Sequence, residues 1–185
     1  MRRLGTMVPR LSVGRVSWPR PGSRYKLGRR ASTARSKTGR GWDWPAGTLN
    51  NNGSQSINAL TFNGGTVDLG TAGALFLTNT LTVNSGNATI TGSGSVPYLD
   101  LNINQAAGSG LIANVQRSFV VNGNLTINTR INDGGINLTG TGTLILQGDS
   151  SSGYELKTNI ASGSTLVVQH NNALGLATDA TITSS

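Results

Sequence analysis

The sequence has 185 residues, a formal net charge of +8 and no cysteine. Disulfides, thiolate metal sites and a cysteine nucleophile are therefore excluded. The charge is unevenly spread, because residues 1–40 hold twelve Lys or Arg and no acid, whereas residues 41–185 hold three basic residues and seven acids.

Residues 1–46 form the first segment, which contains four of the five prolines together with all twelve of those basic residues. Proline and glycine interrupt every helical or alternating pattern, and like charges repel, so we expect this segment to be disordered. It lacks the apolar core of a secretory signal peptide. It could bind nucleic acid or another anionic surface, act as a transit peptide, or be non-native sequence before a misassigned start. The abrupt change of composition near residues 41–47 favours the last interpretation, which makes nucleic acid an unlikely partner.

Residues 47–185 have a different sequence pattern, which consists of short runs in which apolar and polar residues alternate. Such alternation places one side chain inward and the next outward, as in a half-buried strand. Between the runs lie Asn, Gly, Ser and Asp clusters, which form turns because they accept positive φ angles or hydrogen-bond to nearby backbone. The runs are Leu60–Phe62, Val67–Leu69, Leu75–Leu77, Leu81–Val83, Ala88–Ile90, Leu99–Ile103, Phe119–Val121, Leu125–Ile127, Ile136–Leu138, Leu144–Leu146, Leu166–Val168 and Ala180–Ile182.

The spacing of these runs indicates a solenoid. The runs near Leu60, Leu81, Leu101, Val120, Ile145 and Val167 lie about 19 to 25 residues apart, which suits one coil of a parallel β-helix with three short strands. We therefore expect an all-β fold of roughly six coils and essentially no helix. An antiparallel sandwich or barrel is the alternative. Scarce aromatics and the recurrence of Asn at turns, where amides can stack into ladders between coils, favour the β-helix.

Residues 138–175 contain Gly140-Thr-Gly-Thr-Leu-Ile-Leu146, then Tyr154, Thr158-Asn-Ile-Ala-Ser-Gly-Ser-Thr-Leu166 and Asn172-Ala-Leu-Gly175. This order resembles the autotransporter-associated β-strand repeat of bacterial secreted passenger proteins, and residues 57–137 are similar in texture. The resemblance implies a right-handed parallel β-helix exported to the cell surface, usually through a C-terminal outer-membrane barrel. It implies a bacterial cell-surface, outer-membrane or extracellular location.

Both ends of the chain depart from that family's pattern, the N-terminal end because it lacks a signal peptide. No series of ten-residue amphipathic strands follows the repeat region, and the sequence stops within a repeat at Ser184-Ser185. We therefore expect residues 47–185 to be a β-helix region truncated at its C-terminus, a fragment of a longer passenger. Such a fragment exposes strand edges and is expected to aggregate.

No catalytic constellation is found in the sequence. The solitary His170 lies in an Asn-rich turn and is expected at the surface, and the calcium-binding nonapeptide pattern is absent, so we predict no metal site and no cofactor. Asp133-Gly-Gly and Gly-Asp149-Ser are predicted turns. The acids of residues 47–185, which we expect to lie well separated, are Asp68, Asp100, Asp133, Asp149, Glu155 and Asp179.

These observations predict a non-enzymatic protein that acts in adhesion, in autoaggregation or as a display stalk. The expected partners are a host-cell or bacterial surface or a second copy of the chain, with no small-molecule ligand. The alternatives are a polysaccharide-active β-helix enzyme, which would need paired carboxylates, and anion binding through residues 1–40.

Overall fold

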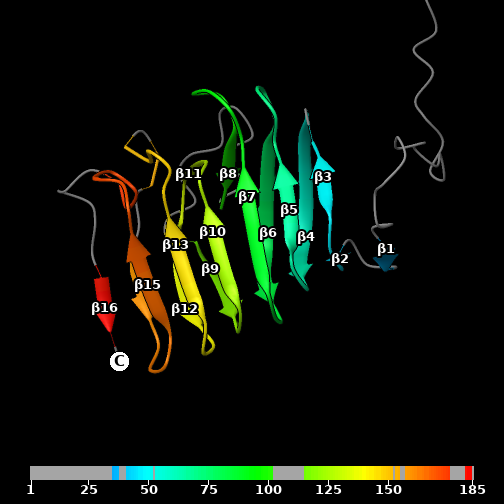
Figure 1. Cartoon of the computed structure of the whole chain (residues 1–185). Helices are drawn as coiled ribbons and strands as arrows, with labels where there is room; N and C mark the ends of the chain where they lie inside the picture. The colour runs from blue at the N-terminus through cyan, green and yellow to red at the C-terminus, as the bar shows by residue number, and fades with distance from the viewer. Residues whose placement is uncertain are drawn as a thin grey trace, which may run out of the picture.

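The computed structural model describes residues 35–37, 41–51, 53–101, 115–151, 153–154, 157–175 and 182–184. Every regular element in these ranges is a β-strand (Figure 1). The described part of the chain contains no helix long and apolar enough to cross a bilayer. The predicted disorder of the N-terminal segment concerns residues that mostly lie outside this description.

The strands form two sheets. The ten-stranded sheet contains β1 (Arg35–Lys37), β2 (Gly41–Trp44), β4 (Ser54–Phe62), β6 (Ala74–Val83), β8 (Tyr98–Asp100), β9 (Gln116–Val121), β11 (Arg130–Asn132), β12 (Gly135–Thr139), β14 (Thr158–Ile160) and β16 (Ile182–Ser184). The six-stranded sheet contains β3 (Thr48–Asn50), β5 (Gly65–Asp68), β7 (Asn87–Thr91), β10 (Asn124–Ile127), β13 (Thr143–Leu146) and β15 (Thr165–Val168).

The chain alternates between the two sheets, and each new strand lies beside the strand that the previous turn of the chain placed in the same sheet. The six-stranded sheet therefore runs in the order β3-β5-β7-β10-β13-β15, and all its described pairs are parallel. The fold is a parallel β-solenoid of about five turns, which confirms the predicted β-helix and excludes the sandwich (Figure 1). Only β1 and β2 pair antiparallel among the described strands.

The two long strands give each rung a third side. A register shift between Ile57 and Ala59 divides β4 into halves, and each half pairs with a different part of β6. The first half of β6 continues to β8 and then β11, whereas its second half pairs with β9. Together with the six-stranded sheet, these halves enclose a narrow three-sided core.

Apolar side chains from successive rungs lie directly over one another in this core. Leu60 pairs with Leu81, Leu81 with Phe119, and Phe119 with Leu138, and all four are at most 1% exposed. Burial of a Leu or Phe side chain is worth roughly 1.5–3 kcal/mol. Because each rung is too small to bury these residues alone, the stack is what stabilises the fold.

One rung is much longer than the others. Hydrogen-bonded Asn side chains on neighbouring rungs are 21 residues apart for Asn63 and Asn84 and 22 for Asn137 and Asn159, but 37 for Asn87 and Asn124. The expectation that the runs near Leu101 and Val120 lie in successive coils was therefore wrong. β8 and β9 are both strands of the long rung, because β8 pairs with the first half of β6 and β9 pairs with its second half, so the turns number about five rather than six.

The solenoid also begins earlier than the expected boundary at residue 47. β2 pairs in parallel with β4, and Trp44 is only 1% exposed, with its indole Nε1 donating to the Gly47 carbonyl at 3.1 Å. The assignment of residues 41–46 to a disordered segment is therefore corrected, because the aromatic side chain packs onto the end of the core beside Phe62.

Candidate functional site

Amide side chains form ladders along the outside of the solenoid. Four pairs on neighbouring rungs are joined by side-chain hydrogen bonds of 2.6 to 3.1 Å, and this confirms the predicted stacking of amides between coils. The pairs are Asn63–Asn84, Asn87–Asn124, Asn137–Asn159 and Gln147–Gln169. Each ladder holds one rung in register with the next while leaving the face polar.

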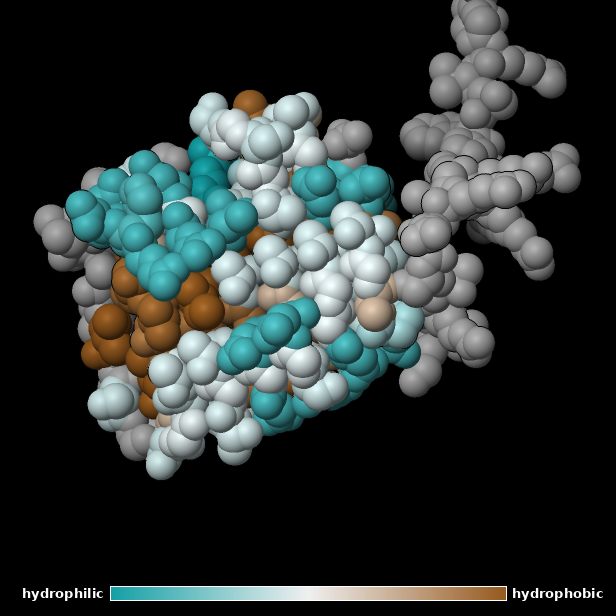
Figure 2. Space-filling model, viewed as in Figure 1, coloured by the Kyte–Doolittle hydropathy of each residue, from teal (hydrophilic) through white to brown (hydrophobic). Residues whose placement is uncertain are grey.

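A column of threonines runs along the outer face of the six-stranded sheet. Thr48, Thr66, Thr89 and Thr126 are direct partners on four consecutive strands, and the inward residues beside them are apolar. The column continues as Ile145 and Val167 on β13 and β15, so its C-terminal end is apolar. Figure 2 shows this face, with pale residues over most of it and brown residues toward β15. Parallel strands lie about 4.8 Å apart, which makes the column a regular array of hydroxyls.

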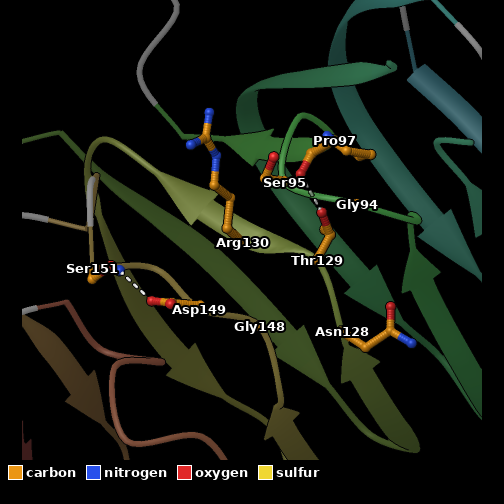
Figure 3. Close-up of a pocket in the computed structure, with 9 residues that line it drawn as sticks. All are labelled: Gly94, Ser95, Pro97, Asn128, Thr129, Arg130, Gly148, Asp149 and Ser151. Atoms are coloured by element: carbon orange, nitrogen blue, oxygen red, sulfur yellow. Dashed lines mark hydrogen bonds between the residues drawn. The ribbon is translucent and has the colours of Figure 1, made fainter. Parts of the chain in front are cut away.

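A cleft of about 210 Å³ opens at one corner of the solenoid (Figure 3). Three turns meet there: the turn before β8, the turn between β10 and β11, and the turn after β13. The cleft lies beside the start of the long rung, where Gly94, Ser95 and Pro97 in the turn between β7 and β8 form one wall. The lining residues are Gly94, Ser95, Pro97, Asn128, Thr129, Arg130, Gly148, Asp149 and Ser151.

Backbone contacts hold the turns of the cleft in place. The buried hydroxyl of Thr129 donates to the carbonyl of Pro97 at 2.6 Å, which joins two of the turns. Gly148 lies so close to the Thr129 carbonyl that a Cβ there would be 2.1 Å from its oxygen. The Asp149 carboxylate accepts the Ser151 N–H at 3.0 Å, so the predicted turn at Asp149 is confirmed.

Two opposite charges line the cleft. The guanidinium of Arg130 lies over the ring of Tyr98, 4.9 Å from its centroid, and Tyr98 in turn packs edge-on against Phe76 at 6.0 Å. Asp149 is exposed, and hydrogen bonds from the Ser151 side chain and backbone lower its pKa below the ordinary value. The carboxylate of Asp149 is therefore ionised at neutral pH.

Stacking also brings together charged residues that are far apart in the sequence. Asn132 donates to the carboxylate of Asp100 at 3.4 Å and to that of Asp133 at 3.3 Å, and both acids are at most 9% exposed. The Nε of Arg117 donates to the Leu101 carbonyl at 2.6 Å. Burial lowers the pKa of Arg117, and the charge of Asp100 opposes that shift. The expectation of well-separated acids was therefore wrong for Asp100 and Asp133.

The remaining predicted residues lie in turns or outside the described ranges. Asp68 accepts the Gly70 N–H at 2.9 Å, and Asp133 has a φ of 48°, as the predicted turn at Asp133-Gly-Gly requires. Glu155 and Asp179 are outside the description. Within the described residues, no three His, Cys, Asp or Glu side chains are grouped as a metal site would need.

The geometry of His170 does not suit a nucleophile–base–acid triad. Its Nδ1 accepts the N–H of Asn172 at 3.2 Å, so the ring proton belongs on Nε2. A triad needs the reverse arrangement, with Nδ1–H donating to an acid and Nε2 accepting from the nucleophile.

Sequence reasoning missed the cleft, although a signal for it exists. Pro97 is the only proline after Pro45, and the stretch Gly92-Ser-Gly-Ser-Val-Pro97 breaks the alternating pattern. Comparison of the chain with protein-family models, curated proteins and solved structures found no match.

Proposed function

We propose that this chain is a non-enzymatic segment of a bacterial surface passenger that acts in adhesion and self-association. The observation that carries the proposal is the threonine column on the six-stranded sheet, where Thr48, Thr66, Thr89 and Thr126 repeat in register. A rigid array of identical hydroxyls suits many weak contacts made at once. Linked contacts of this kind sum to useful binding without any deep site.

The resemblance of residues 138–175 to a passenger repeat supports the surface location. In that region β12, β13, β14 and β15 form two neighbouring rungs, and Tyr154 and Thr158 are buried there. A solenoid segment of this kind serves equally as a stalk that holds the adhesive face away from the cell.

Self-association is supported by the C-terminal end of the same face. Ile145 and Val167 are half-buried on this face, and Val168, which pairs with the buried Leu146 on the inward side of β15, is 43% exposed at the C-terminal end of the core. Within the described residues β15 pairs only with β13, so its other edge presents backbone donors and acceptors. An apolar strand edge with these groups is a template for another chain.

Display of the full chain on a non-adherent bacterium tests the proposal. We expect adhesion to epithelial cells or autoaggregation that grows with display density. The variant Thr66→Lys/Thr89→Lys/Thr126→Lys should lower adhesion about fivefold, because it places charge along the face where the weak contacts are summed.

The matched control is Thr61→Lys/Thr82→Lys/Thr139→Lys, which adds the same charges to the outer face of the ten-stranded sheet. This control should adhere like the parent chain. Equal losses in both variants would contradict the assignment to the six-stranded face. No adhesion and no aggregation at any display density would contradict the proposal, leaving only the role of a stalk.

A further inference from the structure

The cleft at the corner of the solenoid is lined by side chains of several chemical types (Figure 3). We propose that this cleft binds a single neutral sugar ring of a surface glycan. The inference deepens the proposed function and rests on it, because it names the chemical class of the partner that adhesion would engage.

The charges of the cleft favour a neutral ligand. The carboxylate of Asp149 repels phosphate, sulfate and carboxylate groups, and the guanidinium of Arg130 repels cations. A sugar hydroxyl both donates and accepts hydrogen bonds, whereas a carboxylate only accepts and a guanidinium only donates. A neutral polyol can therefore hydrogen-bond with either charged group, whereas an anion is repelled by one and a cation by the other.

The size and the remaining lining groups also fit one ring. The volume of about 210 Å³ is below the roughly 300–1,000 Å³ of clefts that hold drug-sized molecules. The hydroxyls of Ser95 and Ser151 and the amide of Asn128 add donors and acceptors around the rim.

The site is preorganised by contacts that do not need the ligand. The Thr129–Pro97 hydrogen bond joins two walls, the Ser151 N–H orients the Asp149 carboxylate, and stacking on Tyr98 orients Arg130. Fixed groups bind with less loss of conformational entropy. Even so, about twelve heavy atoms at about 0.3 kcal/mol each correspond to a Kd of roughly 1–10 mM, so useful adhesion needs many copies.

Titration of the full-length, ¹⁵N-labelled chain tests the proposal. The probes are the methyl glycosides of mannose, galactose, glucose and N-acetylglucosamine, with glucuronate and inorganic phosphate as anionic probes. We expect at least one neutral glycoside to shift the amide signals of Gly94 and Gly148 with saturation in the millimolar range. Absence of shifts with every neutral glycoside, or tighter binding of phosphate or glucuronate, would overturn the inference.

Two variants separate a binding role from a structural one. Asp149→Asn keeps an oxygen that can accept the Ser151 N–H but loses the charge, and it should raise the Kd about tenfold. Asp68→Asn is the matched control, because Asp68 caps the Gly70 N–H in the same way at 2.9 Å outside the cleft, and it should change the Kd less than twofold. Unchanged binding by Asp149→Asn, with circular dichroism like that of the parent chain, would refute the assignment.

The display assay distinguishes failure of this inference from failure of the proposed function. If displayed chains adhere but no glycoside binds, the cleft assignment fails and adhesion stands. If a glycoside binds in the cleft but displayed chains neither adhere nor aggregate, the site stands and the proposed function fails.

Discussion

Asn159 donates its side-chain N–H to the carbonyl oxygen of the Asn137 side chain at 2.6 Å, across 22 residues of sequence. The two residues are also direct partners in the parallel pair of β12 and β14. Asn159 donates further to the side-chain oxygen of Gln116 at 3.1 Å, so one amide links three rungs. The ladder therefore fixes the register of the outer face, where no apolar packing can do so.

Removal of this amide should weaken the stack. Asn159→Ala is expected to lower the free energy of unfolding by about 1 kcal/mol, because a net intramolecular hydrogen bond is worth about 0.5–1.5 kcal/mol. Urea denaturation of the full chain measures the change. The exposed Asn171→Ala is the control and should lie within about 0.5 kcal/mol of the parent chain. Equal effects at both positions would show that the ladder adds no stability.

Close approach of rungs makes Gly142 hard to replace. A Cβ at this position would lie 1.9 Å from the carbonyl oxygen of Gly123, so Gly142→Ala must push neighbouring rungs apart. We expect a loss of about 2–3 kcal/mol, the usual range for overpacking. At Gly53 a Cβ meets nothing within 4 Å, and Gly53→Ala should cost less than about 0.5 kcal/mol. Thermal midpoints that fall equally in the two variants would contradict this explanation.

Substitutions at two neighbouring residues of β9 distinguish the contribution of core packing to stability from that of strand propensity. Phe119 is fully buried and pairs with Leu81 and Leu138, and Phe119→Ala should cost about 3–5 kcal/mol through the cavity it leaves. Val120 points outward on the same strand, and Val120→Ala should cost less than about 1 kcal/mol. Denaturant titration of both variants checks the difference, and a reversed order would disprove the inward and outward assignment of this strand.

Tyr154 should make stability fall at alkaline pH. Burial raises its pKa to about 12, although the hydrogen bond with the Thr158 hydroxyl opposes the shift. The unfolded chain ionises this tyrosine near pH 10, so its contribution is complete below pH 10 and is lost as the pH rises through 12. The loss is up to roughly 3 kcal/mol.

The comparison between the parent chain and Tyr154→Phe isolates this effect. At pH 7 the free energy of unfolding of the variant should be about 1 kcal/mol lower than that of the parent chain, because the variant lacks the hydrogen bond. Between pH 10 and 12, however, the stability of the variant should fall less than that of the parent chain. Urea midpoints measured at intervals across this range give the answer. Parallel pH curves for the two proteins would mean that Tyr154 does not control the alkaline transition.

Alternation along the chain was enough to predict most of the strands and their inward residues. Leu60, Leu81 and Phe119 were assigned to the core because apolar residues recur at every second position, and all three are buried. The turns at Asp133 and Asp149 followed from residues that accept positive φ or bond to nearby backbone. These features are local, so a few neighbouring residues determine them.

Spacing between rungs was less informative. One rung holds both β8 and β9, and the runs near Leu101 and Val120 were therefore assigned wrongly to successive coils. Trp44 lies in the core although proline and glycine are frequent in its segment. Burial of its large aromatic side chain stabilises the fold by more than the ordering of the neighbouring residues costs.

The sequence by itself determined that the chain forms short strands with one apolar side, and that stacking at a period near 20 residues can bury those sides. Only the tertiary structure decided which turns meet at a corner, and so placed Arg130 and Asp149 in the lining of one cleft and Asp100 and Asp133 around the amide of Asn132. The physical reason is that alternation specifies the side on which a residue lies, whereas the neighbour above it depends on the length of a whole rung. That length is the sum of many turn conformations, and a change in one turn shifts every contact beyond it.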